Sequence, residues 1–172
     1  MLRFYLNDRL VEEASASSNQ TLLRYLRSLP RLSGTKEGCA EGDCGACTVV
    51  IIDKELDGTP AYKAINSCIV LLPSLHGKRV YTVEGLRRNG DYHPVQEAMV
   101  EALGSQCGYC TPGFVMSLFA AYYRKDITES WQKEDQLAGN LCRCTGYRPI
   151  RDALEETVGK APEDHFAAQL KK

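Results

Sequence analysis

The sequence has little net charge, no long apolar run and no segment that resembles a leader. Its 172 residues include 21 Lys and Arg against 22 Asp and Glu, a net charge of −1. Neither nucleic acid nor an anionic membrane surface is therefore expected as a partner. No apolar stretch approaches the roughly 20 residues that span a bilayer. The N-terminus opens into an alternating, strand-like pattern rather than a signal peptide. These absences favour a protein of the cytoplasm.

The arrangements of side chains that usually carry catalysis are also missing. The sequence shows no constellation of paired carboxylates, of Ser with His, or of a phosphate-binding loop that would suggest catalysis. Only three histidines are present, and we expect them at turns or on the surface rather than as metal ligands: His76, His93 and His165. The chain alone is therefore not expected to act on a substrate.

Cysteine, by contrast, is frequent. The chain has eight, and in a reducing compartment thiols are kept for metals rather than for disulfides. Cys39, Cys44 and Cys47 follow the spacing C-x4-C-x2-C, and Cys68 comes one hairpin's length later. This spacing is typical of plant-type ferredoxins, in which four thiolates hold a [2Fe–2S] cluster. The glycines among these cysteines suit a loop that coils closely around a cluster: Gly38, Gly42 and Gly45.

Zinc and disulfides are the alternatives for these four cysteines. Structural zinc sites usually combine two separate C-x2–4-C knuckles, whereas three of these cysteines share one loop. A disulfide framework suits a small secreted chain. The spacing therefore favours an iron–sulfur cluster, and a zinc-stabilised interaction module is the alternative function.

The other four cysteines form two close pairs: Cys107 with Cys110, and Cys142 with Cys144. Each pair falls just before a predicted helix start, marked by Pro112 or Pro149. Helix N-termini stabilise negative charge and lower the pKa of nearby thiols. Two facing helix starts would therefore suit an anionic cluster. From the spacing alone, a zinc ion held by four thiolates remains open.

Hydrophobic periodicity predicts an α+β fold with two domains. A helix is expected from Leu22 to Leu29, ended by Pro30. Alternating or β-branched segments predict strands at Leu2–Leu6, Arg9–Glu13, Thr48–Ile52, Ala61–Ile65 and Arg79–Val83. This order of elements predicts a β-grasp domain of the ferredoxin type over residues 1–83.

Helical spacing replaces the strand patterns after residue 83. We expect an all-α domain over residues 84–158, with four helices that begin near Pro94, Thr111, Trp131 and Pro149. Residues 159–172 have the composition of a linker, and we expect them to form a loosely held tail.

Three segments together resemble the iron–sulfur part of the molybdenum hydroxylases, most closely that of bacterial xanthine dehydrogenases. They are residues 34–49, 104–113 and 140–147. The resemblance includes all eight cysteines and extends to about Val158. It implies a plant-ferredoxin-like domain followed by a four-helix domain, each holding one [2Fe–2S] cluster.

The resemblance also implies a role for each group of cysteines. In that family, a molybdenum–pterin centre hydroxylates the substrate and electrons then leave one at a time. The cluster of Cys107, Cys110, Cys142 and Cys144 would lie near the pterin. The cluster of Cys39, Cys44, Cys47 and Cys68 would pass electrons to FAD and then to NAD. In relatives, the residues that match Gln106 and Cys144 contact the pterin.

Two kinds of partner follow from the same resemblance. One is a large molybdopterin-binding subunit, and the other is an FAD-binding subunit or domain. The expected reaction is the hydroxylation of xanthine or hypoxanthine. Aldehydes and other N-heterocycles, such as nicotinate or isoquinoline, are alternative substrates, because the chain itself holds no substrate pocket.

Overall fold

The structure, a computed structural model, describes residues 1–169. Within them, one mixed sheet has the strand order β2-β1-β5-β3-β4. The strands are β1 (Leu2–Leu6), β2 (Arg9–Glu13), β3 (Thr48–Lys54), β4 (Pro60–Asn66) and β5 (Arg79–Tyr81). β1 and β5 run parallel, and the other neighbouring strands run antiparallel. The predicted strands are thus confirmed, although the last one ends earlier because the chain turns into the short helix η2 (Val83–Gly85).

One face of the sheet is covered by α1 (Leu22–Ser28). The Thr21 hydroxyl caps this helix by accepting the Arg24 N–H at 3.3 Å. Leu22 and Leu26 are fully buried and belong to one core with side chains from β1, β3, β5 and the short helix η1 (Leu72–Leu75). This sheet with a helix gripped against it is the predicted β-grasp arrangement.

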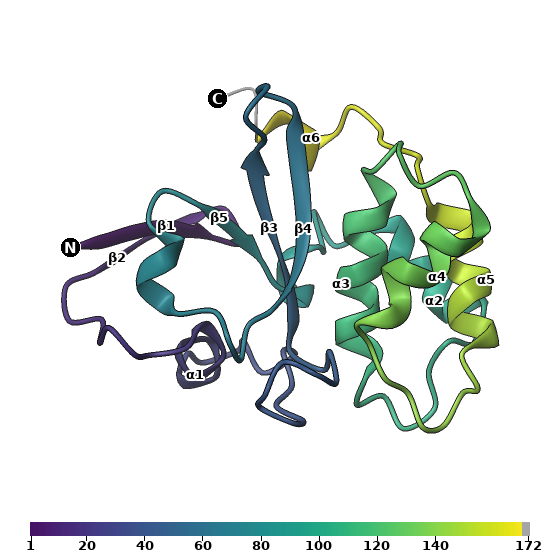
Figure 1. Ribbon diagram of the computed structural model, residues 1–172, viewed down its shortest axis with the longest axis horizontal. Helices are drawn as coiled ribbons and strands as arrows, with labels where there is room; N and C mark the ends of the chain where they lie inside the picture. The colour runs from purple at the N-terminus through teal and green to yellow at the C-terminus, as the bar shows by residue number, and fades with distance from the viewer. Residues whose placement is uncertain (170–172) are drawn as a thin grey trace.

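The second half of the chain is helical, as predicted. Its four main helices are α2 (Pro94–Glu101), α3 (Thr111–Tyr122), α4 (Ser130–Ala138) and α5 (Arg148–Thr157). α3 is buried on all sides from Gly113 to Tyr122, since it stands between the sheet and the other helices (Figure 1). No helix in the described part of the chain combines the length and the apolar character needed to cross a bilayer.

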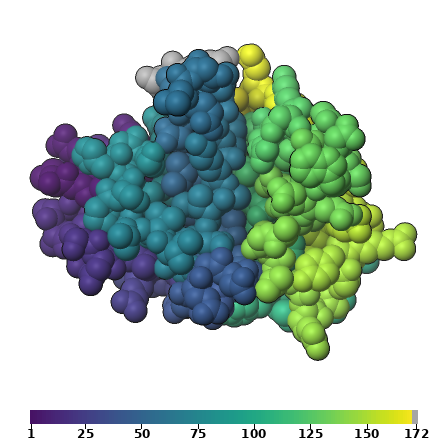
Figure 2. All heavy atoms as spheres, in the orientation of Figure 1, coloured from purple at the N-terminus to yellow at the C-terminus, as the bar shows by residue number. Residues whose placement is uncertain are grey.

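The two halves share one hydrophobic core. Val50 and Ile52 of β3 are buried together with Tyr62, Tyr81 and the residues of α3. Their neighbours Val49 and Ile51 are buried in the core around α1. β3 is therefore covered on both faces, which explains its unbroken run of β-branched residues. Figure 2 shows the segment that contains β3 and β4 lying between the N-terminal strands and the helices.

The prediction of a loosely held tail is wrong for residues 159–169. The N–H groups of Gly159 and Ala161 donate to the carbonyls of Ala121 and Tyr122 at the end of α3. The segment then forms the short helix α6 (His165–Ala168), and Phe166 is only 2% exposed. One buried aromatic ring outweighs the polar composition of the segment, which is why the linker prediction failed. Residues 170–172 lie outside the described residues.

His93 is not the surface residue that we expected. It is 5% exposed, and its ring is surrounded by Phe119, Tyr122 and Phe166. Nδ1 accepts the Val95 N–H at 3.3 Å and so caps α2. Nε2 lies 3.1 Å from the Tyr123 hydroxyl. Burial lowers the pKa of His93 to about 4.

Phe166→Ala should destabilise the chain. The ring packs against Tyr81, Phe119 and His93, with centroids 5.0 to 5.5 Å away. Removing such a ring costs about 3–5 kcal/mol in the free energy of unfolding, which urea unfolding would measure. Trp131→Ala is the control, because Trp131 is 67% exposed and its loss should cost about 0.5 kcal/mol or less. Equal, small losses in the two variants would contradict the docked position of α6.

His93 should make the stability depend on pH. Its pKa falls from an ordinary 6.5 to about 4 on folding, so the unfolded chain takes up the proton first. Stability is therefore lost as the pH falls from about 6.5 to about 4, by up to about 3 kcal/mol. His93→Asn keeps an N-cap acceptor but does not titrate in this range. Urea unfolding at several pH values should show a shallower loss for this variant, and parallel curves would refute the assignment.

Candidate iron–sulfur sites

The first cysteine loop coils tightly before β3. Gly45 has a φ of +70°, a conformation that glycine adopts without strain. Gly38 is needed for a different reason, since a Cβ atom there would lie 2.7 Å from Cys44 Sγ. The loop thus brings its backbone against its own sulfur atoms, as predicted for a chain that wraps a cluster.

Backbone N–H groups converge on the sulfur of Cys39. Those of Asp43 and Cys44 lie 3.3 Å from Cys39 Sγ, and that of Glu41 lies 3.5 Å away. These hydrogen bonds lower the pKa of Cys39 to about 7, because they favour the thiolate. A site for an anionic cluster needs donors of this kind around its sulfur ligands.

Cys47 and Cys68 form the inner side of the same site. Both are buried, and they pack with Leu23 of α1. Burial, followed by a hydrogen bond with the Cys47 thiol, raises the pKa of Cys68 to about 11. Cys39 and Cys44 are only half-buried, so the site has one buried pair and one pair at the surface.

The second site lies at the starts of α3 and α5, as predicted. Cys110 is the N-cap residue of α3, and Cys144 precedes Tyr147, the N-cap residue of α5. Tyr147 takes a left-handed conformation with φ of +67°. Its hydroxyl accepts the Cys142 N–H at 2.9 Å, which ties the cysteine loop to the helix start.

The thiols of the second site also meet in pairs. A hydrogen bond with Cys107 raises the pKa of Cys144. Burial, followed by a hydrogen bond with the Cys142 thiol, raises the pKa of Cys110 to about 12. For Cys142 burial acts in the same direction, but the Thr145 hydroxyl and N–H outweigh it and lower the pKa to about 7.

These pairs fit binuclear iron. None of the eight cysteines forms a disulfide. Among residues 1–169, no group of three or more His, Cys, Asp or Glu side chains is disposed around a single metal position. The thiols instead approach two by two, and a [2Fe–2S] cluster needs two thiolates on each iron. The cysteine residues present therefore fit one such cluster at each site.

The two cysteine loops touch each other. The Leu141 N–H donates to the Cys44 carbonyl at 3.0 Å, and Leu141 directly precedes Cys142. Nearby, the Tyr109 hydroxyl donates to the Glu37 carbonyl at 2.5 Å. The Tyr109 side chain thus reaches from the second group of cysteines to the residue pair that precedes Cys39. The sequence did not predict the contact of Leu141 with the first loop, because a backbone N–H carries no distinctive sequence signal.

The predicted pterin-contacting residues lie at the surface. Gln106 and Cys144 are both exposed. Apolar side chains are exposed in the same part of the helical half: Val100, Leu103, Tyr109 and Leu141. An apolar groove of about 390 Å³ between α2 and α3 includes Val100 and Leu103 and reaches Ser105.

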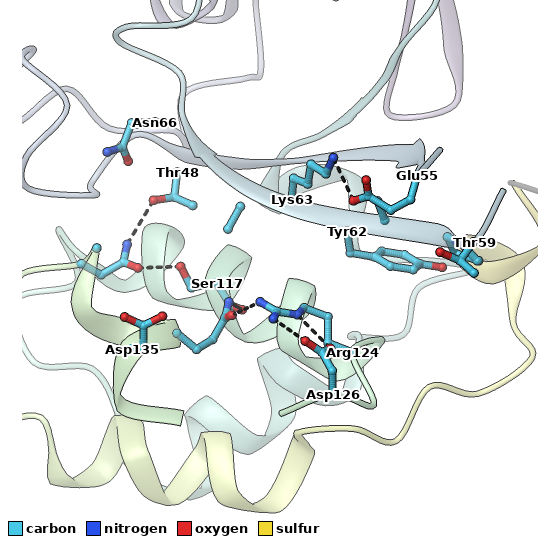
Figure 3. Close-up of a pocket in the computed structure, with 16 residues that line it drawn as sticks. Thr48, Glu55, Thr59, Tyr62, Lys63, Asn66, Ser117, Arg124, Asp126 and Asp135 are labelled. Atoms are coloured by element: carbon cyan, nitrogen blue, oxygen red, sulfur yellow. Dashed lines mark hydrogen bonds and ion pairs between the residues drawn. The ribbon is translucent and has the colours of Figure 1, made fainter. Parts of the chain in front are cut away.

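A second, polar groove lies away from the thiols. It has a volume of about 690 Å³ and runs between β4 and the helices α3 and α4. Thr48 and Ser117 face each other across it (Figure 3). Arg124 is paired with Asp126, and Lys63 with Glu55, so the groove presents no cluster of unpaired cations.

Two families of iron–sulfur domains match the chain. Residues 4–72 match the family described as 2Fe-2S iron-sulfur cluster binding domain. Residues 82–155 match the family described as [2Fe-2S] binding domain. Together they include all eight cysteines.

Complete relatives are much longer than this chain. Xanthine dehydrogenase of Emericella nidulans is 48% identical over 155 residues, which are 90% of this chain and 11% of the relative. Human aldehyde oxidase is 47% identical over 160 residues, 90% of this chain and 12% of the relative. The chain thus spans about a tenth of the length of these relatives.

Solved structures agree with this relationship. Quinoline 2-oxidoreductase from Pseudomonas putida 86 superposes with a TM-score of 0.71 at 30% identity, covering 99% of this chain and 94% of that one. Aldehyde oxidoreductase from Desulfovibrio gigas gives a TM-score of 0.75 at 30% identity, covering 99% of this chain and 17% of that one. The chain therefore belongs to the family of two-domain [2Fe–2S] proteins that form the iron–sulfur part of molybdenum hydroxylases.

Proposed function

We propose that the chain is an electron-transfer subunit or domain that relays electrons from a molybdenum–pterin centre to FAD, and from there to NAD. Cys39, Cys44, Cys47 and Cys68 would hold one [2Fe–2S] cluster. Cys107, Cys110, Cys142 and Cys144 would hold the other. Each bound cluster supplies a site that accepts and gives up one electron, and the chain supplies burial, spacing and hydrogen bonds.

The hydrogen bond between Leu141 and Cys44 carries this proposal. It joins the peptide of one cluster ligand to the residue just before a ligand of the other cluster, Cys142. A path from Cys44 to Cys142 thus consists of covalent bonds and one hydrogen bond. A module that used its thiolates only for folding would not need this connection.

The exposure of the two sites supports a direction for the relay. Gln106 and Cys144 are exposed, and so are the apolar side chains of Leu103, Tyr109 and Leu141, each of which stands three residues from one of them in the sequence. An exposed apolar surface of this kind suits a protein partner, and we assign it to the large molybdopterin-binding subunit. On the other site, Cys39 and Cys44 lie nearer the surface than Cys47 and Cys68. This outer rim would face the FAD-binding subunit or domain.

The substrate belongs to the proposed partner rather than to this chain. Relatives named xanthine dehydrogenase and aldehyde oxidase match it about equally well, at 48% and 47% identity. We propose xanthine, hypoxanthine or a similar heterocycle as the substrate of the whole enzyme, and the cytoplasm as its location.

The metal content of the purified chain tests the proposal. The protein should be reddish-brown, should bleach with dithionite and should contain about four irons per chain, as two binuclear clusters require. Metal analysis and visible absorption would measure this. A colourless protein that contains zinc in place of iron would instead support the zinc-stabilised module.

Cys39→Ser should abolish one cluster and spare the other. The two ligand sets come from separate segments, so the iron content should fall from about four to about two per chain. EPR spectra of the reduced protein should lose one of two signals. Ser33→Ala, an exposed change outside both ligand sets, is the control and should keep both signals. Loss of both signals in Cys39→Ser would contradict two independent sites.

A further inference from the structure

The side chain of Asn140 is buried in the seam between the two cysteine loops. It is only 3% exposed. Its Nδ2 donates to the Gly45 carbonyl at 3.0 Å and to Thr48 Oγ1 at 3.1 Å. Its Oδ1 accepts from the Ser117 hydroxyl at 2.5 Å. One amide thus contacts the first cysteine loop, the start of β3 and the middle of α3.

Each polar hydrogen of the Asn140, Thr48 and Ser117 side chains has an acceptor in this network. The Thr48 hydroxyl donates to the Gly45 carbonyl at 2.7 Å, so its oxygen is free to accept from Asn140. The two hydrogens of the amide are then both used, and the Ser117 hydroxyl fixes the amide oxygen. A side chain with a donor end and an acceptor end is required, and a carboxylate of the same shape would lack the donors.

The backbone on both sides of this amide leaves no room for adjustment. A Cβ atom at Gly45 would lie 2.2 Å from the Gly139 carbonyl oxygen. A Cβ atom at Gly113, in the first turn of α3, would lie 2.2 Å from the Gly45 carbonyl oxygen. The first cysteine loop is thus pressed against the loop before Cys142 and against the start of α3.

We propose that Asn140 is a positioning residue that fixes the distance between the two clusters. This inference rests on the proposed function, because it needs both clusters to be present. Two successive carbonyls of the first loop, those of Cys44 and Gly45, are held by the successive residues Leu141 and Asn140. Asn140 therefore keeps the Leu141 N–H in register with Cys44.

The polar groove explains why a side chain without amide donors could not replace Asn140. Thr48 and Ser117, which both bond to Asn140, line the groove, and Figure 3 shows the hydroxyl of each joined by a dashed line to that same amide. Water from the groove would compete for the Gly45 carbonyl once the amide donors were lost. The first loop would then separate from Leu141.

Asn140→Asp in the full chain is the main test. The carboxylate keeps the shape of the side chain but cannot donate to Gly45 and Thr48. In the dithionite-reduced protein, we expect the EPR splitting caused by spin coupling between the two clusters to weaken or disappear, because this coupling falls steeply with distance. Hydrogen exchange of the Leu141 amide should also become faster. The iron content and the separate signal of each cluster should persist.

Gly139→Ala is the matched control. It changes the neighbouring residue of the same loop, and a Cβ atom there would meet nothing within 4 Å. Its EPR splitting should equal that of the unchanged chain. Thr48→Val is a milder second variant, which removes one of the two oxygens that accept from the amide and should weaken the splitting less than Asn140→Asp.

Each outcome decides the proposal. Full iron content with an unchanged splitting in Asn140→Asp would overturn the role of Asn140 and leave the electron relay intact. If Asn140→Asp fails to keep its iron, an unchanged splitting in Thr48→Val would overturn the role in the same way. An unchanged chain that binds no iron would instead overturn the proposed function, and the inference would fall with it.

Discussion

The packing of β3 between α1 and α3 is the constraint on which the rest of the structure depends. Val49 and Ile51 are buried in one core and Val50 and Ile52 in the other. The first cysteine loop runs directly into this strand, and α3 begins directly after Cys110. Because proteins pack their interiors densely, the strand and the helix hold the two thiol sites at a fixed separation. Electron transfer between two centres requires that kind of rigidity.

Each site combines a thiol whose pKa is lowered with a thiol whose pKa is raised. Cys39 and Cys142 have neighbours that donate hydrogen bonds, and each has a pKa of about 7. Cys68 and Cys110 are held by burial in a neutral state, with a pKa of about 11 and about 12. Binding of one cluster by Cys68 and of the other by Cys110 would therefore release protons from these two thiols.

The sequence predicted the features that depend on local spacing and periodicity. It did not predict the positions of residues that are fixed by a single long-range contact. Cysteine spacing placed all eight thiols in two groups, and proline and apolar spacing located the helices. The positions of Phe166 and His93 depend on a shared aromatic core that forms only when α3 meets the sheet. Asn140 has the signature of a helix stop in the sequence, yet its amide lies between three separate segments. Such long-range contacts have no periodic signal.

The shared core also limits how the chain can be divided. Residues 1–83, expressed alone, would leave Val50, Ile52, Tyr62 and Tyr81 without the helix that covers them. An exposed apolar face of this size promotes aggregation. The helical half alone would in turn expose one side of α3, which is buried from Gly113 to Tyr122 in the structure. Although the chain carries two sequence domains, it should therefore fold and melt as one cooperative body.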